Sequence, residues 1–181
     1  MFHVRWHARA ARLRYWPLPA RPHNGLMKLE GQVVIARDIE DVWALFMDIQ
    51  NLPKWDRSVA RVQVTSGDGG VGTTFDTFAT GDRGRMSYEV TKLRAPYEHE
   101  AVTRSGFFRR ARWHFNLNAT ADGTNVTCVS DFSLRARHLW LAPVLAVTGT
   151  KALRTDMAEL KRVAEAAPGS SGLMRPPLPD K

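Results

Sequence analysis

The sequence predicts an α+β protein with one antiparallel sheet of about seven strands, two short helices after the first strand, and a long C-terminal helix. A helical apolar period follows the first strand, over about residues 38–55. The period then changes to two residues between about 58 and 134, where short turns separate the segments. Helical spacing returns over about 138–166. Because successive strands joined by tight turns pair as a meander, the sheet is predicted to be antiparallel.

The N-terminal elements follow from apolar spacing and from capping residues. "LEGQVVIA", residues 29–36, predicts the first strand. Asp38 stands at the N-cap of the first predicted helix, whose apolar face is formed by Ile39, Val42, Phe46 and Ile49. Asn51 stands at the N-cap of a second, short helix, "LPKW", which has Pro53 in its opening turn.

The remaining elements are six strands and one helix. The strands are predicted at about 58–66, 72–80, 84–93, 97–104, 108–119 and 124–134. The helix is predicted at about 138–166, with an apolar stripe of Leu139, Val147, Leu153, Met157, Leu160 and Ala164.

Alternation is clearest in the penultimate strand, "RRARWHFNLNA", residues 109–119. One face carries Ala111, Trp113, Phe115, Leu117 and Ala119, and the other carries Arg110, Arg112, His114, Asn116 and Asn118. Because a sheet that packs on a helix turns its apolar face inward, the arginines are predicted to face solvent. An RNA-binding sheet would expose its aromatic residues and carry a glycine-containing motif that this strand lacks, so no nucleic-acid partner is expected.

The same parity assigns faces to the other strands. The residues predicted to face inward are Met86, Tyr88 and Val90 on one strand, and Val126, Cys128, Ser130 and Phe132 on another. For two strands, the alternation does not decide which face points inward. On the third, Phe75 and Thr77 compete with Asp76 and Phe78, and on the fifth, His99 and Ala101 compete with Val102 and Arg104.

Charge divides the chain into three zones. Residues 1–27 hold five arginines and no acid, which supplies +5 of the net charge of +8. We expect a basic, disordered arm at 1–27, a domain at 28–167, and a flexible Pro/Gly/Ser-rich tail at 168–181. A membrane-binding amphipathic helix in the arm is the second interpretation, ranked below disorder. The nearly neutral domain lacks the concentrated basic face that phosphate binding needs.

Residue counts exclude several other classes. The single cysteine, Cys128, excludes an intramolecular disulfide, and the histidines show no metal-ligand spacing, so neither metal nor cofactor is expected. No apolar run reaches the roughly 20 residues of a membrane span. Without a secretory signal, a cytoplasmic location is expected. The sequence carries no signal for an oligomeric state.

The order of elements and the local sequence resemble one known superfamily. "VVIARDIEDVWALFMDIQNLPKWDRSV", "GGVGTTF" and "WHFNLNATADGTNVTCVSDF" are similar, in order and spacing, to the START-related SRPBCC (Bet v 1-like) proteins, in their polyketide cyclase/dehydrase-like branch. The resemblance covers about residues 29–166. It implies a helix-grip fold, in which a curved sheet wraps around the C-terminal helix and leaves a hydrophobic cavity. Members include lipid carriers, hormone receptors and aromatic cyclases, so the fold does not choose a function.

The sequence is compatible with three functions. The first is binding of a lipid-like, polyketide-like or aromatic molecule in that cavity, with these expected contacts: Phe75, Met86, Tyr88, Trp113, Phe115, Ser130, Phe132, Trp140, Leu153 and Met157. The second is a cyclase or dehydratase in the same cavity, with the catalytic candidates Tyr88, His99, Arg104 and Asp76. The third is an interaction or membrane-associated protein that uses the basic arm.

Overall fold

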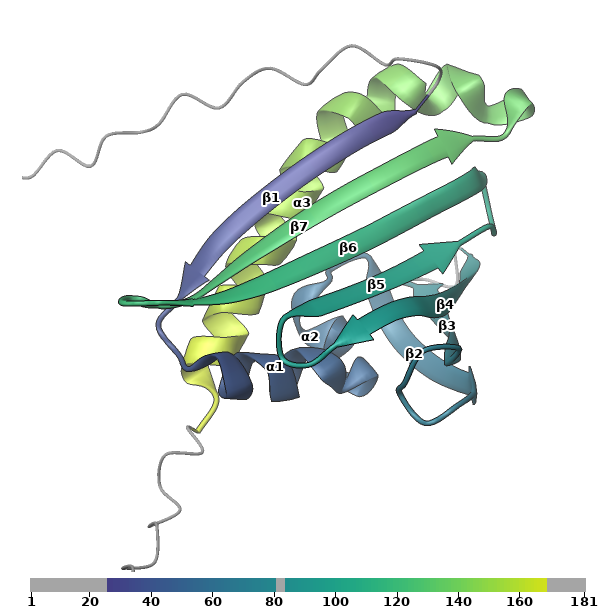
Figure 1. Cartoon of the computed structure of the whole chain (residues 1–181). Coiled ribbons are helices and arrows are strands. Elements are labelled where there is room, and N and C mark those ends of the chain that lie inside the picture. The colour runs from purple at the N-terminus through teal and green to yellow at the C-terminus, as the bar shows by residue number, and fades with distance from the viewer. Residues whose placement is uncertain (1–25, 81–83, 169–181) are drawn as a thin grey trace, which may run out of the picture.

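A computed structural model describes residues 26–80 and 84–168 (Figure 1). The strands are β1 (Met27–Ile35), β2 (Val59–Ser66), β3 (Thr74–Ala79), β4 (Arg85–Arg94), β5 (Glu98–Thr103), β6 (Phe108–Thr120) and β7 (Gly123–Leu134). The helices are α1 (Ile39–Met47), η1 (Ile49–Asn51), α2 (Leu52–Trp55), η2 (Ala136–Leu141) and α3 (Ala142–Ala166). Apart from its last two residues, the predicted arm lies outside the described residues, and so does nearly all of the predicted tail.

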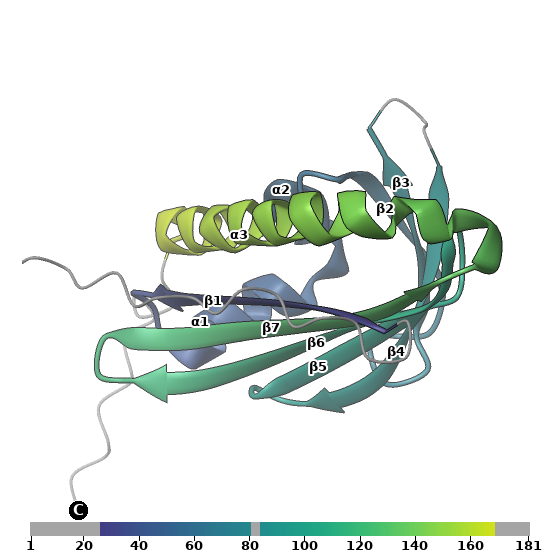
Figure 2. The ribbon, with the colours of Figure 1, turned by 90° about the horizontal axis from the view of Figure 1, so that it is seen from above.

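The seven strands form one antiparallel sheet in the order β1-β7-β6-β5-β4-β3-β2. β1 and β2 are therefore the two edges, although only the helical connection separates them in the chain. The sheet curves, and α3 lies along its concave face with α1 and α2 closing one side (Figures 1 and 2). This arrangement confirms the α+β, helix-grip fold.

The short helices form where the sequence predicts them, but their caps differ. Asp38 occupies the N-cap position of α1 in an extended conformation, yet its side chain makes no capping hydrogen bond. Asn51 likewise makes no capping bond to α2; its amide donates to the carbonyl of Leu45 at 3.0 Å instead. The capping bond in this region comes from Asp48, whose carboxylate accepts from the backbone N–H of Gln50.

The predicted long helix begins as a 3₁₀ segment, and its apolar stripe is shorter than expected. The buried positions of α3 are Leu153, Met157, Leu160 and Ala164. Leu139 and Val147, which were predicted on this stripe, are exposed by 55% and 75%. At 100° per residue, Val147 lies about 120° away from Leu153, and so it faces solvent.

The principal hydrophobic core joins the helices to the middle of the sheet. Its members include Ile35, Val42, Phe46, Trp55, Phe115, Leu117, Val126, Cys128, Met157 and Leu160. A second cluster is formed by side chains of β2, β3, β4 and β5, and a third lies where β6 and β7 meet the start of α3. The alternation in β6 and β7 places apolar side chains inward as predicted, except that Ala119 is exposed near the β6–β7 turn.

Side chains on the outward face of β6 form ion pairs with side chains of the neighbouring strands β5 and β7. Arg112 contacts Asp131 on β7 and Glu100 on β5, and His114 contacts Glu98 at 2.7 Å. The arginines between the aromatic residues of this strand therefore face the solvent side of the sheet, where Arg112 forms cross-strand ion pairs.

Candidate functional site

Two adjoining hollows lie between the sheet and the helices. The inner lobe has a volume of about 110 Å³, and its apolar wall includes Phe46, Trp55, Phe75, Phe115 and Met157. The outer lobe has a volume of about 460 Å³ and is lined by residues that include Met86, Phe107, Phe108, Phe132 and Leu145. The outer lobe alone is within the usual size range of small-molecule sites, about 300–1,000 Å³.

The lobes meet at a ring of seven residues that line both, which we call the junction. It consists of Asp56, Val59, Thr77, Tyr88, Trp113, Leu153 and Asp156. Four of the seven, Asp56, Thr77, Tyr88 and Asp156, come from four separate segments: the end of α2, β3, β4 and α3. Each of these four carries a carboxyl or hydroxyl group. The junction therefore gathers polar groups within a largely apolar cavity.

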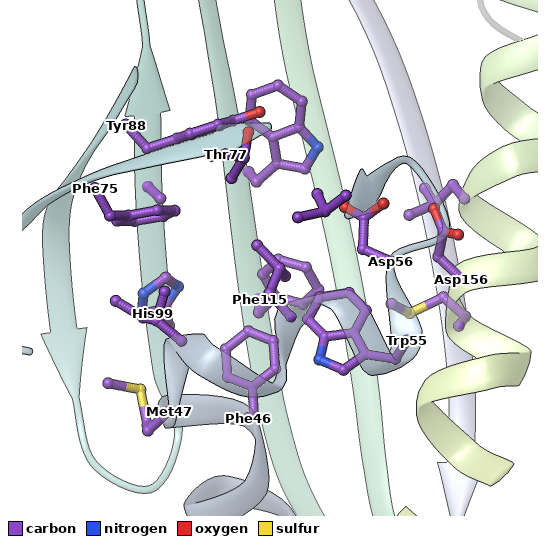
Figure 3. A pocket seen from close by; sticks show the side chains of 17 residues that line it. Phe46, Met47, Trp55, Asp56, Phe75, Thr77, Tyr88, His99, Phe115 and Asp156 are labelled. Atoms are coloured by element: carbon purple, nitrogen blue, oxygen red, sulfur yellow. The ribbon is translucent and has the colours of Figure 1, made fainter. Parts of the chain in front are cut away.

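Two carboxyl groups lie on one side of the junction, Asp56 after α2 and Asp156 on α3 (Figure 3). Asp56 Oδ1 accepts hydrogen bonds from the backbone N–H of Ser58 at 2.9 Å and from its hydroxyl at 2.6 Å. Asp156 Oδ1 accepts a longer bond, 3.4 Å, from the backbone N–H of Arg57. The two acids are thus held by neighbouring residues of one turn.

Burial dominates the electrostatics of both acids. It raises the pKa of Asp56 above the ordinary value, against the two bonds from Ser58. Burial also raises the pKa of Asp156, and the negative charge of Asp56 adds to the effect, which brings it to about 6. A carboxyl group with this pKa exchanges a proton close to neutral pH.

On the sheet side of the junction, Tyr88 and Thr77 lie next to each other (Figure 3). The Tyr88 ring stacks on Phe75, with centroids 5.2 Å apart, and meets Trp113 edge to face. Burial raises the pKa of the Tyr88 hydroxyl well above its usual value, while the nearby Thr77 hydroxyl opposes this. Tyr88 is therefore a neutral hydroxyl fixed by aromatic packing.

His99 lies on β5 and faces the inner lobe, where it meets Phe46 edge to face at 5.4 Å. Burial lowers its pKa to about 4, so the imidazole is neutral at pH 7. Its Nδ1 has no hydrogen-bond partner among the described residues, and neither has Nε1 of Trp55, which lines the same lobe. Such unpaired nitrogens are costly when buried.

Cys128 is fully buried in β7, and burial raises the pKa of its thiol. It is a core residue, because a reactive cysteine needs an accessible thiolate. Within the described ranges, no group of three or more His, Cys, Asp or Glu side chains is arranged to hold a metal ion.

The structure places nine of the ten expected ligand contacts on the lobes: Phe75, Met86, Tyr88, Trp113, Phe115, Ser130, Phe132, Leu153 and Met157. The tenth expected contact, Trp140, does not line the cavity. It belongs to η2, is 69% exposed, and lines neither lobe. The 3₁₀ segment that precedes α3 carries its ring to the outside.

The structure also decides between the open registers. Phe75 and Thr77 face the cavity, so Asp76 faces outward, where it accepts from the Ser87 hydroxyl at 2.6 Å and lies 3.6 Å from Arg85. His99 and Ala101 face the inner lobe, whereas Arg104 follows the end of β5 and is exposed. Asp76 and Arg104 are therefore removed as catalytic candidates.

Sequence reasoning missed Asp56 and Asp156. One signal was available for Asp156, because it lies three residues after Leu153 and next to Met157, on the inward stripe of α3. An acid at a core-facing helical position is unusual. Asp56 gave no such signal, since it follows a four-residue helix whose orientation depends on tertiary packing.

The comparisons with known proteins agree with this fold. Residues 27–165 match the family described as polyketide cyclase / dehydrase and lipid transport. The chain belongs to this family. No protein among those with curated descriptions matches this family member.

Solved structures share the fold of this polyketide cyclase/dehydrase family member. The protein TTHA0849 from Thermus thermophilus has a TM-score of 0.64 at 15% identity, over 77% of this chain and 97% of its own. Ara h 8.0201 has a TM-score of 0.59 at 12% identity, over 79% of this chain and 100% of its own. A Thalictrum norcoclaurine synthase point mutant, in complex with a transition-state analogue, has a TM-score of 0.59 at 10% identity, over 77% and 94%. These likenesses support the SRPBCC, Bet v 1-like fold.

Among the described residues, no helix combines the length and the apolarity that crossing a bilayer requires.

Proposed function

We propose that this protein binds a hydrophobic small molecule in the two-lobed cavity, with a polar group of that molecule at the junction. The observation that carries the proposal is the distribution of polarity. Aromatic and aliphatic side chains line both lobes, while Asp56, Thr77, Tyr88 and Asp156 converge where the lobes meet. Burial of apolar ligand surface supplies affinity, and a few convergent polar groups fix orientation.

The shape of the cavity narrows the class of ligand. A volume of about 110 Å³ in the inner lobe suits a ring or a short chain, and about 460 Å³ in the outer lobe suits a larger apolar body. The ligand we propose therefore has two apolar parts with an oxygen or nitrogen function between them. Lipid-like, polyketide-like and extended aromatic molecules all meet this description.

Two measurements test the proposal. Native mass spectrometry of the protein purified from its own host is expected to detect a co-purified apolar molecule. Titration with the neutral fluorophore N-phenyl-1-naphthylamine is expected to give a saturable rise in fluorescence with about one probe bound per chain. An Ala101→Leu variant, which fills the inner lobe from β5, is expected to reduce probe binding. Absence of both a retained molecule and saturable probe binding would contradict the proposal.

A second function, a cyclase or dehydratase, is favoured by one specific observation. Such an enzyme needs proton-transferring groups at its cavity, and Asp56 and Asp156 both have raised pKa values there. Asp156, with a pKa of about 6, would act as the acid or base, with the Tyr88 hydroxyl opposite as a hydrogen-bond donor to a developing enolate. Its test is turnover of the molecule recovered from the host by wild type and by Asp156→Asn, which is expected to lose most of the activity.

A further inference from the structure

Large apolar side chains are exposed together where η2 passes into α3. They are Leu139, Trp140, Val144 and Val147, exposed by 55%, 69%, 51% and 75%, and we call them the apolar patch. Val144 and Val147, three residues apart on α3, lie on one side of that helix, and Leu139 and Trp140 lie shortly before it in η2. Single apolar residues on a surface are ordinary, whereas several large ones exposed within one short stretch of the chain indicate an interaction site.

The helical segment that carries the apolar patch also contributes to the wall of the outer lobe. Leu145 packs in the cluster of Phe108 and Phe132, and Leu145 and Gly149 line the outer lobe. These two residues alternate with Val144 and Val147 along the same turns of α3. One side of this helical segment therefore borders the cavity while the other faces out of the molecule.

The sequence segment that carries the apolar patch has formal charge of one sign. Residues 132–155 contain no acid and four bases, namely Arg135, Arg137, Lys151 and Arg154. The Arg135 guanidinium donates to the backbone carbonyls of Arg104 and Gly106, at 2.7 and 3.1 Å, so these bonds leave its positive charge unneutralised. Arg137 bonds to His138, which is also not an acid.

The N-terminal segment joins the molecule at this same end. β1 begins at Met27, which pairs with Phe132 shortly before η2, and Figures 1 and 2 both show the start of β1 close to the start of α3. Residues 1–25, which precede it, carry five arginines and no acid. The segment that precedes β1 in the chain and the segment that carries the apolar patch therefore both have a positive formal charge.

We propose that this end of the protein docks on an anionic lipid bilayer, with the apolar patch inserted at the level of the headgroups. The positive charge of this segment decides which kind of partner can cover the apolar patch. A second copy of this surface, or the arginine-rich N-terminal segment folded back on it, would bring positive charge against positive charge. A bilayer with anionic lipids supplies both an apolar interior and negative charge, and tryptophan favours its interface. Stable attachment needs two such contributions together.

The test uses the full chain and vesicles of phosphatidylcholine alone or with about 30% phosphatidylglycerol. Wild type is expected to co-sediment with the anionic vesicles and not with the neutral ones, and salt is expected to weaken binding. Val147→Glu is expected to weaken it by about tenfold or more, because it removes an apolar contact and adds a negative charge. Tyr97→Glu is the matched control, since Tyr97 is 46% exposed at the opposite end of the sheet.

A site-specific label separates the apolar patch from the N-terminal segment. Val147→Cys provides an accessible thiol, because the native Cys128 is fully buried. An environment-sensitive nitrobenzoxadiazole group at position 147 is expected to shift to the blue on anionic vesicles, while the same group at position 97 is not. Native circular dichroism of each variant establishes that it is folded.

Three results would overturn the proposal. The first is a wild-type protein that does not bind anionic vesicles. The second is wild-type binding by Val147→Glu together with loss of binding when the five N-terminal arginines are replaced by glutamine. The third is a label at position 147 that shifts with protein concentration in the absence of lipid, which would assign the apolar patch to contact with a second copy of the chain.

Discussion

Asp56, which follows α2, and Asp156, on α3, line the same junction of the cavity, where the charge of Asp56 raises the pKa of Asp156. Acids placed this way oppose folding at neutral pH, because the folded state disfavours their charged forms. A protein keeps such groups at the expense of stability, and this is a common pattern at functional sites.

The stability effect of Asp156 has a definite sign. Its pKa is about 6 in the folded protein against about 3.9 when unfolded, so the folded state holds more protons between these values and loses stability as the pH rises through them. Asp156→Asn is therefore expected to raise the free energy of unfolding by about 1–2 kcal/mol at pH 7.5, since solvent screens part of the effect at this half-buried group, and to have little effect at pH 4. Urea denaturation at the two pH values measures this.

Glu159, one turn further along α3, is the matched control. Hydrogen bonds from Arg162 and Arg57 hold the pKa of its carboxyl below the usual value, so its ionised form favours folding. Glu159→Gln is expected to lower stability at pH 7.5, the opposite direction. If Asp156→Asn and Glu159→Gln both destabilised the protein at pH 7.5, burial would not be the dominant effect at Asp156.

Filling the outer lobe is expected to block ligand binding. Ser130 is 2% exposed and lines that lobe from β7, so Ser130→Leu places a larger apolar group in the cavity. Affinity for N-phenyl-1-naphthylamine is expected to fall by about tenfold or more. Val129→Leu enlarges a side chain on the opposite face of the same strand and is expected to bind as wild type does. Equal loss in both variants would mean that the probe binds elsewhere.

The Tyr88 hydroxyl distinguishes a binding protein from an enzyme. If it only orients a ligand, Tyr88→Phe is expected to weaken binding by about 0.5–1.5 kcal/mol. If it donates a hydrogen bond to a developing enolate, turnover is expected to fall by about 10²-fold or more. Affinity and turnover are measured on the molecule recovered from the host, with Tyr97→Phe at an exposed turn as the control. No change in either quantity would remove Tyr88 from the site.

Substitutions on the two faces of β6 are expected to differ in their effect on the free energy of unfolding. Phe115 is 6% exposed and lies 4.7 Å from the Phe46 ring centroid, so Phe115→Ala is expected to cost about 3–5 kcal/mol in unfolding free energy. Arg110, exposed on the same strand, is expected to cost about 0.5 kcal/mol or less when replaced by alanine. Thermal and urea unfolding measure both. Reversed costs would contradict the register of the strand.

The order of the secondary-structure elements and the inward face of β6 could be predicted from the sequence alone. Strict alternation over residues 109–119 predicts which side of β6 packs inward, because successive side chains of a strand point to opposite faces and one set is apolar. The switch from helical spacing to alternation and back predicts the order of the elements. Both features depend on local periodicity, which the chain carries in itself.

Tertiary structure alone decided the faces of β3, where Phe75 and Phe78 lie on opposite sides and either face offers an aromatic ring to the core. The structure turns Phe75 inward against Tyr88, while Arg61 covers the outward Phe78 ring at 3.6 Å. Parity relates the residues of one strand to each other, but it leaves the choice of face to the contacts of neighbouring strands.

The junction depends on tertiary structure even more. Asp56 and Asp156 are brought together only because the short helix α2 packs between α3 and the start of β2. No periodic pattern links residues so far apart in the sequence. Their raised pKa values arise from burial, and for Asp156 also from the charge of Asp56; both effects come into being only when the chain has folded.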